Sequence, residues 1–144
     1  MSALGLKIID ESVQRANIWF NEVDYRTGWA NKQRSYRLLR AVLHALRDHL
    51  NPDEAAQLSA QLPILIRGIY YEGYDPSKTP VTERSREGFV ARVQSAFDTD
   101  PMGDAEDAIG AVFDVLDAHV SGGEMAHVRA TFTKEMRALF AERS

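Results

Sequence analysis

The sequence aligns with itself without a gap when it is shifted by 70 positions. The identical pairs include Ala41, Val42, Leu46, His49, Glu54, Ala56, Ala60 and Arg67 with Ala111, Val112, Leu116, His119, Glu124, Ala126, Ala130 and Arg137. Apolar positions correspond as well and keep the same helical periodicity in both halves. This agreement of register and periodicity indicates an internal duplication, with a unit longer than the usual short solenoid repeats.

Each half reads as three helices, because its apolar residues recur at spacings of three and four. We expect helices at about 6–23, 31–50 and 52–72, and again at about 79–97, 104–120 and 123–142. The first helix carries one apolar face, formed by Ile9, Val13, Ala16, Phe20 and Val23. No strand pattern is present. The sequence therefore predicts an all-α fold, a six-helix bundle made of two pseudo-symmetric three-helix repeats, at about 6–74 and 79–142 of one domain covering 1–144.

Start and stop signals support these boundaries. Asn51-Pro52-Asp53-Glu54 combines a capping residue with proline at the first helical position, and Ser121-Gly-Gly-Glu124 has the capping-box pattern. Pro63 lies inside the apolar pattern of the third helix, and we expect it to kink that helix or loosen a turn.

Composition excludes several classes of protein. The 144 residues include no cysteine, so disulfides, thiol nucleophiles and cysteine metal sites are excluded. No apolar run approaches the ~20 residues of a membrane span, and the N-terminus lacks the pattern of a signal peptide. We therefore expect a cytoplasmic protein that does not contact a membrane. The formal net charge of −4 makes nucleic-acid binding unlikely on electrostatic grounds.

Two stretches resemble a known family. They are Leu39-Arg-Ala-Val-Leu-His-Ala-Leu-Arg-Asp-His-Leu50, and Ala60-Gln-Leu-Pro63 followed by Arg67-Gly68 and Tyr70-Tyr-Glu-Gly73. Together they resemble the bacterial domain-of-unknown-function family numbered 2267, over about 16–140. The resemblance implies a small all-helical cytoplasmic protein and implies no activity. Tyr74 stands where the family motif has a tryptophan.

The far face of the third helix is the first candidate site. Arg67 lies opposite the apolar stripe of that helix, and Tyr70, Tyr71 and Tyr74 follow it closely. An arginine beside aromatic rings can bind an anion or a partner's helix. The alternative is a second core face in which Arg67 pairs with an acid. Arg137 at the equivalent place in the second half favours that structural interpretation.

A basic ridge on the second helix is the second candidate site. Its members are Arg37, Arg40, His44 and Arg47, and their equivalents in the second half are Asp107, Gly110, Asp114 and Asp117. Basic and acidic ridges could pair within one chain or between two chains. The alternative is that both ridges are solvated helix faces.

No motif predicts catalysis or a metal centre. Glu124 and His127 match the Glu-x-x-His pattern of di-iron bundles, but Gln57 stands at the equivalent of His127 and Glu124 is already explained as a capping residue. We expect no metal and no cofactor. No nucleophile elbow or phosphate-binding loop is present.

Two functional hypotheses follow from these features. The preferred one is a non-enzymatic binding or protein-interaction module that acts on an unknown protein partner, with a homodimer as one form. It would act through Arg67, Tyr71 and Tyr74 and through the linker after them, at 75–80. The alternative is a protein that binds a small anionic molecule, or an enzyme, with a pocket between the repeats lined by Arg40, His44 and Arg67.

Overall fold

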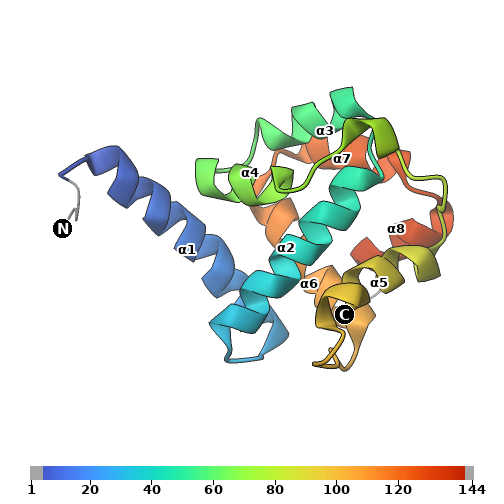
Figure 1. Ribbon diagram of the computed structural model, residues 1–144, viewed down its shortest axis with the longest axis horizontal. Helices are drawn as coiled ribbons and strands as arrows, with labels where there is room; N and C mark the ends of the chain where they lie inside the picture. Colours follow the sequence, from blue (N-terminus) through green and yellow to red (C-terminus); the bar gives the residue numbers. More distant parts are fainter. Residues whose placement is uncertain (1–4, 142–144) are drawn as a thin grey trace.

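The computed structural model describes residues 5–141, and its regular structure is entirely helical (Figure 1). No strand occurs among these residues, which confirms the all-α class. The α-helices are α1 (Lys7–Thr27), α2 (Lys32–Asp48), α3 (Pro52–Ser59), α4 (Ile64–Tyr71), α5 (Arg86–Gln94), α6 (Ala105–His119), α7 (Gly122–Thr131) and α8 (Lys134–Ala141), with short 3-10 helices at Pro76–Lys78 and Ser95–Phe97.

The described residues form eight α-helices where the sequence pattern predicts six. The expected third helix of each half is divided into two, α3 with α4 and α7 with α8. Pro63 precedes α4 with ψ of 152°, and Phe132 ends α7 with ψ of 147°. Both values are extended rather than helical, so the chain leaves the helix at these points. The break at Pro63 falls where a kink was expected, and it is complete.

Helix α5 also begins later than the sequence pattern indicates. The expected start lies near 79–82, whereas α5 starts at Arg86. Ser85 sets this start, because its Oγ accepts a hydrogen bond from the Gly88 N–H at 2.9 Å. The residues before Ser85 run along the molecule in an extended path, and Arg84 anchors them to the carbonyls of His49 and Thr131.

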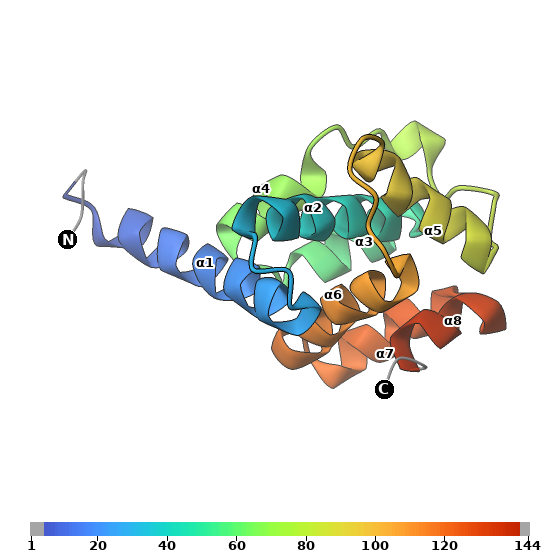
Figure 2. The same ribbon diagram turned by 90° about the horizontal axis from the view of Figure 1, so that it is seen from below.

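Helices α2 and α6 form the centre of the molecule. α2 packs against α1, α4, α5 and α6, and α6 packs against α1, α5, α7 and α8. Figure 2 shows α2 to α5 on one side of the molecule, with α6 to α8 on the other side. The buried apolar side chains form one cluster drawn from both halves of the chain. Its largest fully buried members are Trp19, Tyr70, Phe89, Phe113 and the leucines of α2.

Helix α1 extends beyond this core. Its C-terminal half packs against α2 and α6, while its N-terminal half projects away from the other helices (Figures 1 and 2). Ala16 and Val23 are buried, as the apolar face predicts. Ile9 and Val13 lie on the same face but are 40% and 46% exposed. The apolar face is therefore covered only from about Ala16 onward, and its first two turns reach solvent.

The two predicted caps differ in detail. At α3, the Asn51 side chain accepts from the Glu54 N–H at 2.8 Å, and Glu54 accepts from the Asn51 N–H at 2.9 Å. This is a complete capping box. At α7, Ser121 Oγ accepts from the Glu124 N–H at 3.2 Å, but the Ser121 N–H donates to Gln61 Oε1. Glu124 therefore does not complete the box that its sequence predicts.

Candidate functional site

Arg67 lies at the break between α3 and α4. Its Nε donates to the Ser59 carbonyl at 2.8 Å, and its Nη2 donates to the Leu62 carbonyl at 2.8 Å. The Ser59 carbonyl has no donor four residues later, because that residue is Pro63, and it also accepts the Leu62 N–H of the turn at 3.1 Å. Arg67 therefore stabilises the turn by binding backbone oxygens rather than the acid that the structural alternative proposed.

The three tyrosines of the predicted binding face pack inward. Tyr70 is fully buried, and its hydroxyl donates to the Ala55 carbonyl at 2.9 Å. Burial raises the pKa of the Tyr70 hydroxyl, which stays protonated. The Tyr71 hydroxyl donates to Ser59 Oγ at 3.0 Å, and the Tyr71 ring centroid lies 5.5 Å from that of Tyr74. The three rings pack edge to face and tilted on one another, and Tyr71 and Tyr74 lie partly buried against the core.

The basic ridge of α2 holds the end of α4. Arg47 is only 4% exposed, and its Nη1 donates to the carbonyls of Tyr70 at 3.0 Å and Glu72 at 2.6 Å. Its guanidinium also pairs with Asp48 at 2.9 Å and lies 5.3 Å from the Tyr74 ring centroid. A buried arginine needs such compensation, because an unpaired charge in the core is costly.

Arg40 and His44 complete this attachment at the surface of α2. Arg40 pairs with the Glu72 carboxylate at 2.9 Å, and His44 Nε2 donates to the Ile69 carbonyl at 2.7 Å. Burial lowers the pKa of His44, although the Ile69 carbonyl opposes this effect. Arg37 instead pairs with Asp100 at 3.1 Å. The ridge thus takes its partners from α4 and from the loop before α6.

The structure does not bring Arg40, His44 and Arg67 into one pocket. Arg40 and His44 line a pocket of about 250 Å³ between α2 and α5, together with Arg92. Arg67 lines a different pocket, on the other side of α4. The anion site predicted from these three residues therefore does not form as a single cavity.

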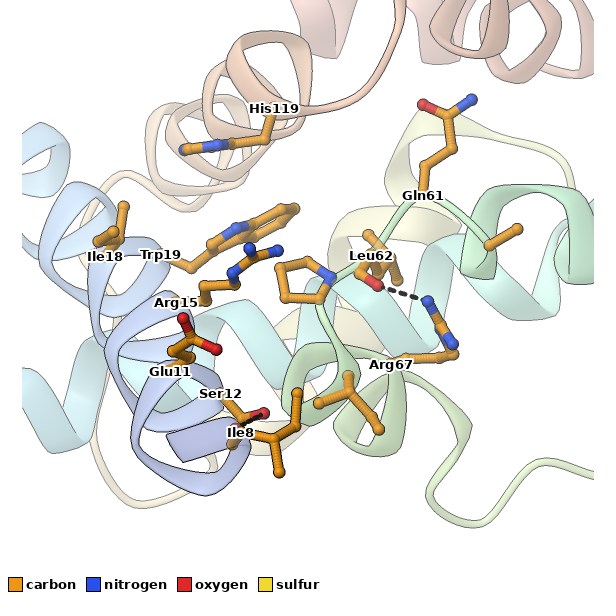
Figure 3. Close-up of a pocket in the computed structure, with 13 residues that line it drawn as sticks. Ile8, Glu11, Ser12, Arg15, Ile18, Trp19, Gln61, Leu62, Arg67 and His119 are labelled. Carbon is orange, nitrogen blue, oxygen red and sulfur yellow. Dashed lines mark hydrogen bonds between the residues drawn. The ribbon is translucent and has the colours of Figure 1, made fainter. Parts of the chain in front are cut away.

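The pocket that contains Arg67 lies between α1 and the turn that joins α3 to α4, with a volume of about 620 Å³ (Figure 3). Glu11 and Arg15 of α1 line one side, and Arg67 lies on the opposite side. Trp19 and His119 stack with their ring centroids 5.0 Å apart, and His119 Nε2 contacts Glu22 at 2.6 Å. The pocket mixes apolar walls with charges of both signs.

A second groove, of about 470 Å³, lies along the apolar face of α1, between α1, α2 and α4. Phe20 and Tyr36 pack edge to face within it, with ring centroids 5.6 Å apart. Leu65 of α4, which is 42% exposed, forms part of its wall. Ile9 and Val13, on the uncovered part of α1, lie on the same helix face as Ala16 and Phe20 of the groove. We call the whole region the α1–α4 surface, defined by Ile9, Val13, Ala16, Phe20, Tyr36, Leu65 and Ile69.

Sequence reasoning missed the α1–α4 surface because its residues look like core residues. A spacing of three and four identifies a buried face but does not say whether the same chain covers it. The helix lengths expected from the sequence pattern provide no signal either, because α1 is longer than α2, with 21 residues against 17, only in the structure. Exposed apolar side chains that continue from a groove are typical of interaction surfaces.

A third pocket, of about 590 Å³, separates α3 from α7 and contains Glu54, Glu124 and His127. Glu124 and His127 are the pair that matched the di-iron pattern. No cluster of three or more histidine, aspartate or glutamate side chains suited to a metal ion occurs in residues 5–141. Within the same residues, no helix combines the length and the apolar character needed to cross a membrane.

Comparison with known proteins assigns the family. The chain belongs to the DUF2267 family, described as an uncharacterized conserved protein, whose sequence profile matches residues 16–139. The matched range begins at Ala16, where α1 enters the core, and ends in α8. No curated protein matches the chain. The family assignment confirms the resemblance of the two motifs and identifies no activity.

Proposed function

We propose that this chain is a non-enzymatic protein-interaction module that acts through the α1–α4 surface, and that an amphipathic helix supplied by a second copy of the chain occupies this surface. The observation that carries the proposal is the continuity of one apolar face. Ala16, Phe20 and Val23 pack on the core, while Ile9 and Val13 continue the same face into solvent.

The α1–α4 surface is complementary to itself. Its N-terminal part is a ridge of apolar side chains on a projecting helix, and its C-terminal part is a groove beside Phe20 and Leu65. Two copies related by a two-fold axis near Val13 would place each ridge in the other's groove, with the two α1 helices antiparallel. Such an isologous contact closes after two subunits, because it covers the α1–α4 surface of both copies.

Burial energy and helix stability both favour this contact. Ile9, Val13 and Leu65 are 40%, 46% and 42% exposed. Covering each exposed part contributes roughly 1 kcal/mol, and the contact occurs twice in a dimer. Two turns of helix without tertiary contacts are marginally stable in water. A partner helix along α1 would bury this apolar surface and would also stabilise the first two turns of the helix.

The predicted Arg67 and tyrosine face is less suited to binding in this arrangement. Tyr70 and Arg47 are buried, and Arg67 is bound to backbone carbonyls. We therefore assign the interaction to the α1–α4 surface. The anion-binding alternative gains no support, because Arg67 lies in a different pocket from Arg40 and His44.

Sedimentation equilibrium tests the proposal, with wild type compared with Val13→Glu and with Gln14→Glu. Both variants introduce one negative charge in the same turn of α1. Val13 lies on the apolar face, whereas the adjacent Gln14 is exposed and points away from that face. We expect wild type and Gln14→Glu to dimerise at micromolar concentration, and Val13→Glu to dissociate at least 30-fold more readily. A monomeric wild type at every concentration, or equal dimerisation of all three proteins, would overturn the proposal.

We also propose that the fold consists of two repeats, at about 6–74 and 79–142. Adding 70 to the bounds of α4, 64 and 71, gives those of α8, 134 and 141. Arg67 and its equivalent Arg137 both donate to a carbonyl five residues earlier, that of Leu62 at 2.8 Å and that of Phe132 at 2.9 Å. These correspondences support duplication, and separate expression of 79–144 as a folded helical unit would test it.

A further inference from the structure

The pocket between α3 and α7 has an acidic, partly enclosed interior. Glu54 reaches it from α3, and Glu124 and His127 reach it from α7. Leu50 and Val128 supply apolar wall. A concave site with apolar walls and a few convergent polar groups is the usual form of a small-molecule site. It lies apart from the α1–α4 surface and shares no residue with it.

Glu124 is available in this pocket because Gln61 replaces it at the helix cap. Gln61 Oε1 accepts the Ser121 N–H at 2.7 Å, which the carboxylate of a capping box would otherwise accept. Glu54, its equivalent at α3, keeps one carboxylate oxygen on the Asn51 N–H at 2.9 Å. The Glu124 carboxylate in the second half of the chain therefore does not take part in helix capping.

The electrostatics of the pocket favour a positive charge. Partial burial raises the pKa of Glu124, and the Glu54 carboxylate raises it further, while His127 on the same helix opposes them. Tyr70 of α4 also lies close enough to interact with Glu124. Arg84 lines the pocket, but its guanidinium is bound to the carbonyls of His49 and Thr131. A cation between the two glutamates would remove their repulsion.

His49 adds an independent observation. It lines the same pocket, is 1% exposed, and donates from Nδ1 to the Ala45 carbonyl at 2.7 Å. Nε2 therefore carries a lone pair, and among residues 5–141 this buried nitrogen has no hydrogen-bond partner. Burial lowers the pKa of His49, and Arg84 and Arg92 lower it further, while the backbone carbonyls of Ala45 and Glu83 oppose this effect. An unpaired buried acceptor is uncommon, and a donor on a bound molecule would satisfy it.

We propose that this pocket binds a small organic cation, an ammonium group on an aliphatic body. Glu54 and Glu124 bind the ammonium group through charge-assisted hydrogen bonds. Leu50 and Val128 contact the aliphatic part, and His49 provides a further acceptor at the pocket wall. The site is distinct from the α1–α4 surface, so the proposal of cation binding and the proposal of dimerisation can be disproved independently.

Isothermal titration calorimetry with 1,4-diaminobutane tests the proposal, with 1,4-butanediol as the uncharged comparison. We expect saturable one-to-one binding of the diamine, no binding of the diol, and at least a tenfold loss of affinity in Glu124→Gln. Glu135→Gln removes the same charge from the exposed face of α8 and should bind as wild type does. Affinity should rise with pH above the ordinary glutamate pKa of 4.5, as Glu124 ionises.

Two results would overturn the proposal. One is the absence of saturable diamine binding to the wild-type protein. The other is an equal effect of Glu124→Gln and Glu135→Gln, which would mean that the diamine responds only to the net charge of −4. Glu124→Gln relieves repulsion with Glu54, so it should be at least as stable as wild type, which thermal unfolding checks. Val13→Glu should bind the diamine normally, which separates this site from the interaction surface.

Discussion

Gln61 and Ser121 hold each other through two reciprocal hydrogen bonds. Gln61 Nε2 donates to Ser121 Oγ at 3.0 Å, and the Ser121 N–H donates to Gln61 Oε1 at 2.7 Å. The pair joins the end of α3 to the start of α7, two segments that are distant in sequence. It is therefore both a helix cap and a tertiary contact between the halves of the chain.

Gln61→Ala should lower the free energy of unfolding by about 1 kcal/mol, because it removes both hydrogen bonds at an exposed site. Ser121→Ala should cost about as much, since it also removes the bond to the Glu124 N–H. Urea denaturation of both variants and the double variant measures their coupling, which we expect to be at least 0.5 kcal/mol. Additive effects would contradict a direct contact.

Arg47→Ala should destabilise the protein by about 3 kcal/mol, because it leaves the carbonyls of Tyr70 and Glu72 without their donor in the core. Arg40→Ala is the matched control on the same helix face. Its pair with Glu72 is partly exposed, so its loss should cost less than about 1 kcal/mol. Chemical denaturation compares the two, and equal losses would argue against a special role for Arg47.

Arg67→Ala tests whether Arg67 is structural or belongs to a binding face. The variant loses the bonds to the carbonyls of Ser59 and Leu62, and water replaces them only in part. We expect a loss of about 1–2 kcal/mol in unfolding free energy. Dimerisation measured by sedimentation should not change. A change in association with unchanged stability would restore the original hypothesis of a binding face.

Stability should fall as the pH is lowered below about 6.5, because burial lowers the pKa of His44 and of His49 from that value. The unfolded chain then binds protons that the folded chain does not, so protonation favours unfolding. Below the ordinary carboxylate range, Asp75, Glu83 and Asp100 should add to the loss, since hydrogen bonds lower their pKa values. Thermal unfolding from pH 8 to 2 measures both phases.

His44→Gln checks the first phase. Its side chain can still donate to the Ile69 carbonyl, but it does not titrate. The variant should therefore lose less stability than wild type between pH 7 and 5. A pH dependence identical to that of wild type would mean that the folded and unfolded states bind this proton equally.

The sequence pattern predicts the helical class, the family motif and most helix boundaries, because these depend on local periodicity and capping residues. Ser85 shows where it fails: it caps α5, but Thr79 and Thr82 offer similar signals upstream, and only tertiary contacts decide among them. Pro63 indicates an irregularity but not its size. The break depends on Arg67 reaching back to Ser59 and Leu62, a contact that spacing alone does not reveal.

The candidate sites were harder to predict for a physical reason. Arg47, Arg67 and Tyr70 are polar or amphipathic residues, and sequence cannot distinguish a side chain that binds a ligand from one that satisfies a buried backbone carbonyl. Ile9 and Val13 present the opposite difficulty, since apolar residues serve both a core and an interface. In both groups the location is the opposite of what the side-chain chemistry suggests. The polar residues bind carbonyls in the interior, and the apolar residues Ile9 and Val13 reach solvent.

The projection of α1 gives one helix two different rates of amide hydrogen exchange. Amides from about Ala16 onward are protected by packing on α2 and α6, whereas those near Ile9 open by fraying of the uncovered end. Any protein that covers this end must slow exchange there. Slower amide exchange in the first turns of α1 would therefore reveal that a partner is bound, even when the identity of the partner is unknown.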